Sequence, residues 1–356
     1  MPSQQKALVL ETKFGSLEIK DIDVPKPGPD VVLLRVEAAA LNPADWKIHV
    51  LGALIETYPC ILGSDAAGTI EAVGANVQGF AVGDRVLAQG WYDLPTRAIQ
   101  GTFQQFALAP VSNITKMPSN LSFEAASTIP SGVATAAFPL YNEAEGALSA
   151  KLPPPWEERG RGKLAGKPFF VLGGASSMGQ FALQFARLSG FSPIITTASL
   201  HNTELLKSLG ATHVLDRKLS PEALSKEARA IAGGYFDVVY DAISLPDTLE
   251  AAYNATAPNG DLIVVLQTPI PGAEKNSAKR VHMAHGVFGA EINHAVGKSL
   301  REKLPALLES CAIKNYQPNP VEVLSGGLRG VAGGLDRLRN NQVSGMKLVV
   351  KPQGTV

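Results

Sequence analysis

The residues with the clearest chemical potential are three glycines at a junction between two sequence patterns. The run 169–172 is apolar and strand-like, Gly173, Gly174 and Gly179 follow it, and an apolar helical stretch continues to residue 188. Glycines at a strand-to-helix turn let the backbone approach a pyrophosphate, and the N-terminus of the helix offers N–H groups to that anion. The spacing therefore predicts a dinucleotide site, although glycines at such a junction can also serve close packing alone.

Ser176, Ser177 and Met178 complete this turn, which reads Gly-Gly-Ala-Ser-Ser-Met-Gly. The two serine hydroxyl groups either donate hydrogen bonds to the phosphates of a cofactor or cap the helix that follows. We count all three residues as candidate cofactor contacts and leave the capping alternative open.

The residues after the second strand of this unit indicate which dinucleotide is bound. A carboxylate there binds the ribose diol of NAD, whereas its absence leaves room for the 2′-phosphate of NADP. No Asp or Glu occurs between Gln180 and Thr203, so we expect NADPH as the cofactor. The candidate phosphate contacts, each of which can also cap a loop or face solvent, are Ser199, His201, Asn202 and Arg217.

The sequence offers few metal ligands. Catalytic zinc in a dehydrogenase requires three ligands from Cys, His and carboxylate, and structural zinc typically requires four clustered cysteines. The chain has only Cys60 and Cys311, and its one histidine cluster, His282, His285 and His294, has no obvious Cys or acidic partners. We therefore expect no bound metal, and the cysteine count favours a reducing compartment over a disulfide framework.

The elements that must position these groups follow two rhythms. Short β-rich runs separated by Gly and Pro turns occupy the first part of the chain, at 7–10, 31–40, 69–73, 85–88 and 106–109. The chain becomes helical after residue 123, and 151–167 has the composition of a surface loop. From 168 to 266 strands and helices alternate, which predicts a doubly wound parallel sheet with right-handed crossovers. A helix at 299–312 and a strand at 347–350 follow.

Composition limits the partners. The 356 residues carry 32 basic and 32 acidic side chains, so no net field draws the chain towards nucleic acid or an anionic membrane. The N-terminus lacks the apolar core and cleavage site of a signal peptide, and the glycine turn breaks the uncharged stretch 168–186. We expect a cytoplasmic α/β protein that acts on small molecules.

Two further motifs resemble those of the medium-chain dehydrogenase/reductase superfamily, in which a GroES-like β-rich domain precedes a Rossmann domain. The stretch 42–47 is similar to the segment with the first zinc-ligating cysteine of the zinc alcohol dehydrogenases, with Asn42 at the ligand position. The stretch 63–68 is similar to their Gly-His-Glu segment, with Ser64 in place of the histidine. Because 91–101 also lacks the structural-zinc cysteines, the resemblance is to the zinc-free reductase branch.

Within that branch the chain is most similar to the fungal trans-acting enoyl reductases of the lovastatin and ToxD type, over nearly its whole length. The matching segments lie at 41–47, 62–65, 129–136, 199–202 and 344–350. The resemblance implies an enoyl reductase of polyketide or secondary metabolism, with a free or carrier-bound enoyl substrate and a polyketide synthase as candidate partner.

The chemistry implied is a hydride transfer that needs no metal. NADPH delivers hydride to the β-carbon of an α,β-unsaturated carbonyl, and the protein stabilises the enolate oxygen that develops. Lys47 matches the active-site lysine of the family, while Asn42 and Thr135 match positions that line the nicotinamide. Phe288 matches a segment beside the carboxamide of that ring, and Asp65 either orients Lys47 or caps a local turn. Each of these residues also has a purely structural interpretation.

The resemblance divides the chain into a GroES-like domain at 1–132, a Rossmann NADPH-binding domain at 133–311 and a return to the first domain at 312–356. Two alternative functions stay open. One is an NADPH quinone reductase on the same scaffold, and the other is a non-catalytic protein that binds NADPH or docks onto a synthase.

Overall fold

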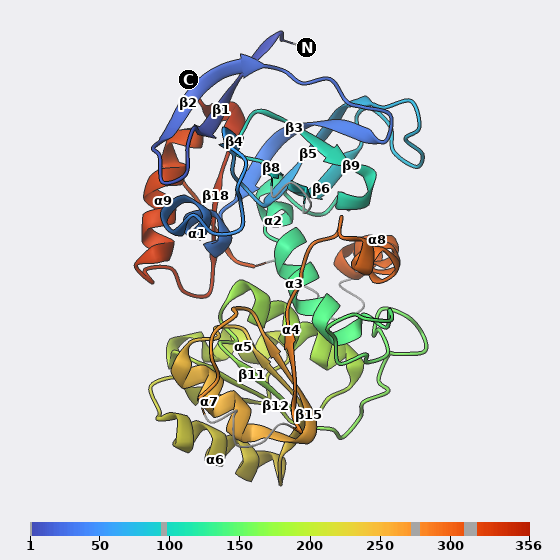
Figure 1. The fold of residues 1–356 in the computed structure, drawn as a ribbon. Coiled ribbons are helices and arrows are strands. Elements are labelled where there is room, and N and C mark those ends of the chain that lie inside the picture. Colours follow the sequence, from blue (N-terminus) through green and yellow to red (C-terminus); the bar gives the residue numbers. More distant parts are fainter. Residues whose placement is uncertain (1, 94–97, 272–277, 310–318) are drawn as a thin grey trace.

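The chain forms two lobes joined by a helix (Figure 1). The computed structural model describes residues 2–93, 98–271, 278–309 and 319–356. The upper lobe in Figure 1 is rich in strands and holds both ends of the chain, and the lower lobe is an open sheet covered by helices. The expected domain boundary at 311/312 and the expected helix end at 312 lie outside the described residues.

The β lobe contains two sheets whose strand orders are β2-β1-β4-β8-β7 and β10-β6-β5-β3-β18-β17, with β9 also paired to β3. Strand β3 is almost entirely buried, which explains its nearly continuous apolar sequence. The strands are β1 Gln4–Leu10, β2 Leu17–Asp23, β3 Val31–Ala40, β4 Cys60–Ile61, β5 Asp65–Val73, β6 Arg85–Gln89, β7 Trp91–Asp93, β8 Ala98–Gln100, β9 Phe106–Pro110, β10 Ile114–Lys116, β17 Val321–Val323 and β18 Lys347–Val350.

The second lobe is a parallel sheet in the order β13-β12-β11-β14-β15-β16, which is the 3-2-1-4-5-6 order of a doubly wound fold. Strand order reverses between β11 and β14, and ligands of such sheets bind outside the carboxyl ends of the strands at that point. The strands are β11 Phe169–Leu172, β12 Ile194–Ala198, β13 His213–Asp216, β14 Phe236–Asp241, β15 Thr256–Val264 and β16 Arg280–Met283. The connecting helices are α4 Ser177–Ser189, α5 Thr203–Leu209, α6 Pro221–Ala232 and α7 Pro246–Ala255.

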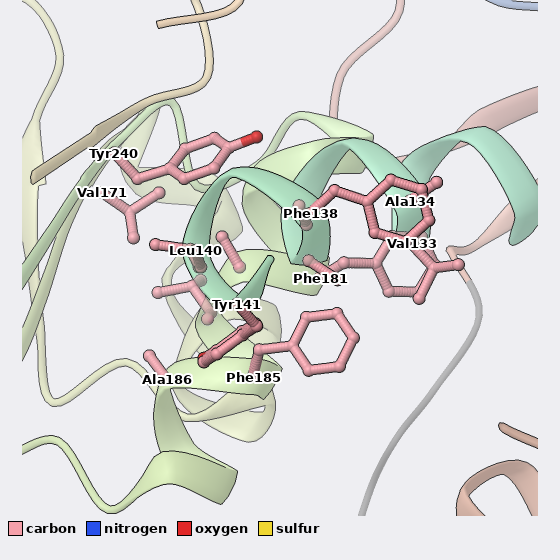
Figure 2. Packing of buried hydrophobic residues seen from close by; sticks show 14 of the residues in the cluster. Val133, Ala134, Phe138, Leu140, Tyr141, Val171, Phe181, Phe185, Ala186 and Tyr240 are labelled. Atoms are coloured by element: carbon pink, nitrogen blue, oxygen red, sulfur yellow. The ribbon is translucent and has the colours of Figure 1, made fainter. Parts of the chain in front are cut away.

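Five further helices belong to the β lobe or to the junction of the lobes: α1 Pro43–Leu51, α2 Phe123–Ser127, α3 Pro130–Tyr141, α8 His294–Glu309 and α9 Gly330–Arg339. Helix α3 runs from one lobe to the other (Figure 1). Figure 2 shows its apolar side chains, such as Phe138 and Tyr141, packed against Phe181 and Phe185 of α4. This contact fixes the start of α4, and hence the glycine turn, relative to the β lobe.

The predicted fold class is confirmed, and most strands of both lobes lie where the sequence placed them. The predicted return of the chain to the first lobe has a structural basis, because β18 pairs with β3 and β17 pairs with β18. The sequence did not predict α1, α9 or the strands β2, β4, β7, β8, β10, β16 and β17. No helix in the described part of the chain combines the length and apolar character required to cross a membrane.

Candidate functional site

The glycine turn is built so closely that side chains cannot replace its glycines. Gly173 has φ +76, a conformation that favours glycine. A Cβ added at Gly174 would lie 2.1 Å from Oγ1 of Thr196, and one added at Gly179 would lie 2.3 Å from the Gly173 carbonyl oxygen. The turn therefore has the close strand-to-helix packing that lets backbone N–H groups face a pyrophosphate.

The two serines of the turn have protein partners. The Ser176 hydroxyl caps α4 by accepting the Gly179 N–H at 3.1 Å, so the capping interpretation applies to it. The Ser177 hydroxyl donates to the side-chain oxygen of Asn319, and Met178 is half-buried against the neighbouring apolar core. The side-chain nitrogen of Asn319 is buried without a hydrogen-bond partner in the described part of the chain. An unused donor beside this turn fits an anionic group such as a cofactor phosphate.

The candidates for the 2′-phosphate lie around the carboxyl end of β12. Ser199 is half-buried at the start of a short 3-10 helix, His201 and Arg217 are exposed, and the Arg217 N–H donates to the Ala198 carbonyl at 3.0 Å. Asn202 differs, since it is buried and its amide donates to the Ser344 hydroxyl at 3.1 Å. The Asn202 side-chain NH₂ group therefore binds the loop before β18 and does not face the carboxyl edge of the parallel sheet.

One carboxylate near this edge was not considered from the sequence. Asp216 ends β13 directly beside Ala198 of β12, and its Oδ1 accepts the Lys218 N–H at 3.0 Å. Asp216 lies on the third strand of the parallel sheet. The sequence analysis looked for a carboxylate only after the second strand and therefore did not consider it.

The start of α1 carries a buried polar cluster. The Lys347 ammonium donates to Asn42 Oδ1 at 2.8 Å and to Asp65 Oδ2 at 2.8 Å, and Asn42 Nδ2 donates to the same Asp65 oxygen at 2.9 Å. The other Asp65 oxygen accepts the Ser131 N–H at the start of α3, at 2.7 Å. The expectation that Asp65 orients Lys47 is therefore corrected, since its charge is paired with Lys347, which is 4% exposed.

Asn42 and Ser64 stand at the two positions that resemble zinc-ligand positions. Both side chains are buried and form hydrogen bonds to other protein groups. Besides the contacts above, the Asn42 N–H donates to Asp45 Oδ2 at 2.7 Å. The Ser64 hydroxyl lies 3.3 Å from Asp45 Oδ1 and 2.5 Å from the Tyr92 hydroxyl. Among the described residues no group of three or more His, Cys, Asp or Glu side chains is placed to hold a metal ion.

Lys47 lies two residues beyond Asp45 on α1. Its side chain is half-buried, and its ammonium lies 5.7 Å from the centre of the Trp46 ring. Burial lowers the pKa of Lys47 from its ordinary value because a partly desolvated ammonium is less stable than a solvated one. A cation in this setting interacts more strongly with a developing anion than a fully solvated lysine does.

The side-chain amide of Gln89 joins the two lobes. Its Nε2 donates to the Gly286 carbonyl at 2.8 Å, and its Oε1 accepts the Phe288 N–H at 2.8 Å. Its Nε2 also lies 3.2 Å from the Ser131 hydroxyl. The amide thus bonds the residues on both sides of position 287, as a peptide group of a neighbouring strand would.

This junction brings Thr135 together with the segment around Phe288. A Cβ added at Gly286 would lie 2.2 Å from Oγ1 of Thr135, so the backbone of that segment packs directly on the threonine. The Phe288 ring points into the core and meets Phe138 edge to face, with ring centroids 5.1 Å apart. Only the backbone of Phe288 is therefore placed to meet a cofactor.

Helix α3 links the polar cluster to the glycine turn. Ser131 at its start bonds Asp65, and a Cβ added at the next residue, Gly132, would lie 2.8 Å from the Ser177 hydroxyl. The predicted groups Asn42, Thr135 and the turn at 173–179 therefore belong to one connected region. Sequence reasoning missed the roles of Gln89, Tyr92 and Lys347, although Lys347 lies in a segment that matched the resembled family.

Comparison with known proteins agrees with this geometry. Residues 28–119 match the alcohol dehydrogenase GroES-like domain, and residues 177–304 match the zinc-binding dehydrogenase family. The chain is 30% identical to trans-enoyl reductase traG of Penicillium crustosum, over 98% of this chain and 97% of the relative. It is also 30% identical to trans-enoyl reductase ACTTS2 of Alternaria alternata, over 98% of both chains. A mycobacterial protein solved in complex with NADPH has the same fold, with a TM-score of 0.76 at 21% identity over 98% of this chain and 100% of that one.

The doubly wound sheet, its glycine turn and the β lobe that adjoins them define an oxidoreductase fold that binds a nicotinamide cofactor. The predicted two-domain architecture and the predicted enzyme class are both confirmed. The chain belongs to the medium-chain dehydrogenase/reductase superfamily, with fungal trans-enoyl reductases among its relatives.

Proposed function

We propose that this protein is an NADPH-dependent, metal-independent reductase of carbon–carbon double bonds conjugated to a carbonyl. The observation that carries the proposal is which residues stand at the two positions that resemble zinc-ligand positions. Asn42 and Ser64 are buried and hydrogen-bonded to protein groups, and the half-buried Lys47 lies on α1, the helix that Asn42 precedes. A conjugated enone suits this arrangement because the carbonyl already polarises the double bond, and the names of the fungal relatives support the same substrate class.

Residues of the two lobes have different roles in the proposed reaction. NADPH, when bound, supplies the hydride. The turn at 173–179 and the start of α4 hold its pyrophosphate, and Ser199, His201 and Arg217 contact the 2′-phosphate. Thr135 and the backbone of Phe288 position the nicotinamide end of the site. Lys47 stabilises the negative charge that develops on the carbonyl oxygen, and Asn42 holds the start of the Lys47 helix in place.

The proposal extends to the setting of the enzyme. The fungal relatives support a role in secondary metabolism, and we propose a small or carrier-bound enoyl substrate, a polyketide synthase as partner and a cytoplasmic location. The alternatives predict other outcomes. A quinone reductase gives a hydroquinone, and a binding protein gives NADPH affinity without turnover.

The test combines binding with turnover. Calorimetry should show that NADPH binds at least about tenfold more tightly than NADH, because no carboxylate follows Thr197 on its own strand. Equal affinities would overturn the cofactor assignment. With a simple conjugated enone, NADPH consumption should yield the saturated ketone and should survive exhaustive chelation. Activity that is lost on chelation and restored by zinc would contradict the metal-independent assignment.

Lys47→Ser tests the role of the lysine. Removing an electrostatic stabiliser of an oxyanion should lower kcat about 100-fold, with the NADPH dissociation constant changed by less than about threefold. Lys298→Ser is the matched control, because that side chain is 74% exposed on α8. Equal kcat values for the two variants would remove Lys47 from the site.

A further inference from the structure

Reduction of an enone requires a proton as well as a hydride, and the chain contains a hydrogen-bonded path that ends at a phenol. We propose that Asp45, Ser64 and Tyr92 form a proton relay that protonates the α-carbon of the enolate, with Tyr92 as the group that meets the substrate. This inference rests on the proposed function and adds the source of the second hydrogen.

The three groups form a continuous chain. Asp45 Oδ1 and the Ser64 hydroxyl lie 3.3 Å apart, and the Ser64 hydroxyl lies 2.5 Å from the Tyr92 hydroxyl. Asp45 is 0% exposed and Ser64 is 4% exposed, whereas Tyr92 is half-buried. The path therefore leads from the fully buried Asp45 to a half-buried tyrosine.

The two oxygens of Asp45 have different partners. Asp45 Oδ2 accepts the Asn42 N–H at 2.7 Å, whereas Oδ1 faces the Ser64 hydroxyl and is the oxygen favoured to carry the proton. A protonated Asp45 therefore donates from Oδ1 to the Ser64 hydroxyl.

The protonation state of Asp45 then fixes the direction of the whole chain. When Asp45 is protonated, Ser64 accepts its hydrogen and donates its own to the Tyr92 oxygen, which leaves the phenol hydrogen free for a substrate. When Asp45 is ionised, Ser64 donates to the carboxylate and Tyr92 donates to Ser64. The phenol is a donor towards the site only in the first state.

The surroundings favour that first state near neutral pH. Burial, aided by the nearby Asp65 carboxylate, raises the pKa of Asp45 to about 7, although the Asn42 N–H, the Lys347 ammonium and the Ser64 hydroxyl oppose the shift. Lys47 lies two residues further along α1 and therefore on a different face of the helix from Asp45. Burial, together with the Asp65 carboxylate and, when it is ionised, the Asp45 carboxylate, holds the pKa of Tyr92 well above its usual range, so the phenol keeps its proton until the substrate takes it.

The step balances in atoms and electrons. Hydride brings two electrons to the β-carbon, and the π electrons move onto the carbonyl oxygen to give the enolate. The enolate then forms a C–H bond at the α-carbon as the Tyr92 O–H bond breaks. The Ser64 proton passes to Tyr92 and the Asp45 proton passes to Ser64, which leaves an Asp45 carboxylate that is reprotonated from solvent.

The test is the pH profile of kcat for the wild-type protein and two near-isosteric variants, with NADPH and a simple conjugated enone. Wild-type kcat should fall as pH rises from about 6 to about 9, because Asp45 loses its proton. Tyr92→Phe should lower kcat at pH 6 by about 100-fold, with NADPH affinity unchanged. Tyr235→Phe is the control, because that phenol is 52% exposed on the other lobe.

Asp45→Asn provides the second, independent readout. Its side-chain oxygen can accept the Asn42 N–H while its NH₂ donates to Ser64, so the variant keeps the hydrogen-bond orientation of the protonated acid at every pH. The amide cannot pass on a proton, so kcat should be low throughout. We expect the fall of kcat around pH 7 to disappear in this variant. An unchanged fall, or a Tyr92→Phe variant with the kcat of Tyr235→Phe, would overturn the relay. Both results presuppose wild-type turnover of the enone, whose absence would instead reject the proposed function.

Discussion

The glycine turn and the polar cluster at α1 are built in opposite ways. The turn consists of backbone and of residues within one short segment, and its geometry depends on side chains being absent at Gly174 and Gly179. The cluster consists of side chains from distant segments, since Lys347 bonds Asn42 and Asp65 across 305 and 282 positions. A site made from missing side chains leaves a local pattern in the sequence, whereas a site made from paired side chains does not.

The largest expected effect concerns the cluster. Lys347→Met leaves the Asp65 carboxylate buried without its ion pair, which should cost about 3–5 kcal/mol of the free energy of unfolding in urea denaturation. Lys351→Met is the control, because Lys351 pairs with Glu124 on the surface and is 55% exposed, a type of pair worth less than about 1 kcal/mol. Equal losses in the two variants would show that the buried cluster does not differ energetically from a surface ion pair.

The next effect is the pH dependence of stability that Asp45 contributes. Its pKa is about 7 in the folded protein and near 4 when unfolded, so between these values the folded state binds more protons and stability falls as pH rises. Asp45→Asn should therefore become more stable relative to the wild-type protein between pH 4 and pH 7, by up to about 1.4 kcal/mol for each pH unit of this window. A difference in unfolding free energy that is flat over this window would show that Asp45 is ionised in the fold.

The smallest effect on stability concerns the turn. Gly179→Ala forces a methyl group against the Gly173 carbonyl, which should cost about 1–3 kcal/mol and weaken NADPH binding at least about tenfold. Gly333→Ala on α9 has open space around the added Cβ and should stabilise the protein by about 0.5–1 kcal/mol. A Gly179→Ala variant with wild-type NADPH affinity would show that this glycine is not required for cofactor binding.

The same contrast explains how far the sequence alone could lead. The strands β3, β11, β14 and β18 were predicted because they are rich in apolar residues and bounded by turns. Helix α1 was missed because only Asp45 and Ile48 of its nine residues are buried, so it lacks an apolar face of helical period. It begins where it does because Pro43 follows the Asn42 cap, and it ends at Gly52 in the left-handed conformation.

Site residues follow the same rule. The turn at 173–179 was proposed from its glycines, and Asn42 and Thr135 were proposed from resemblance. The partner of Asp65 was not found, because a lysine two positions beyond Asp45 and a lysine in the last strand are equivalent candidates until the fold selects one. The role of Gln89 could not be predicted. A glutamine whose side-chain amide bonds the backbone of a distant segment leaves no pattern in the residues around it.

The most direct test of the account is to supply the enzyme with NADPH deuterated at the transferable C4 position, together with a simple conjugated enone, and to analyse the product by NMR. The account predicts a saturated ketone with deuterium at the β-carbon and a hydrogen from solvent at the α-carbon. Bound NADPH without turnover of the enone, or a saturated ketone without deuterium at the β-carbon, would contradict it.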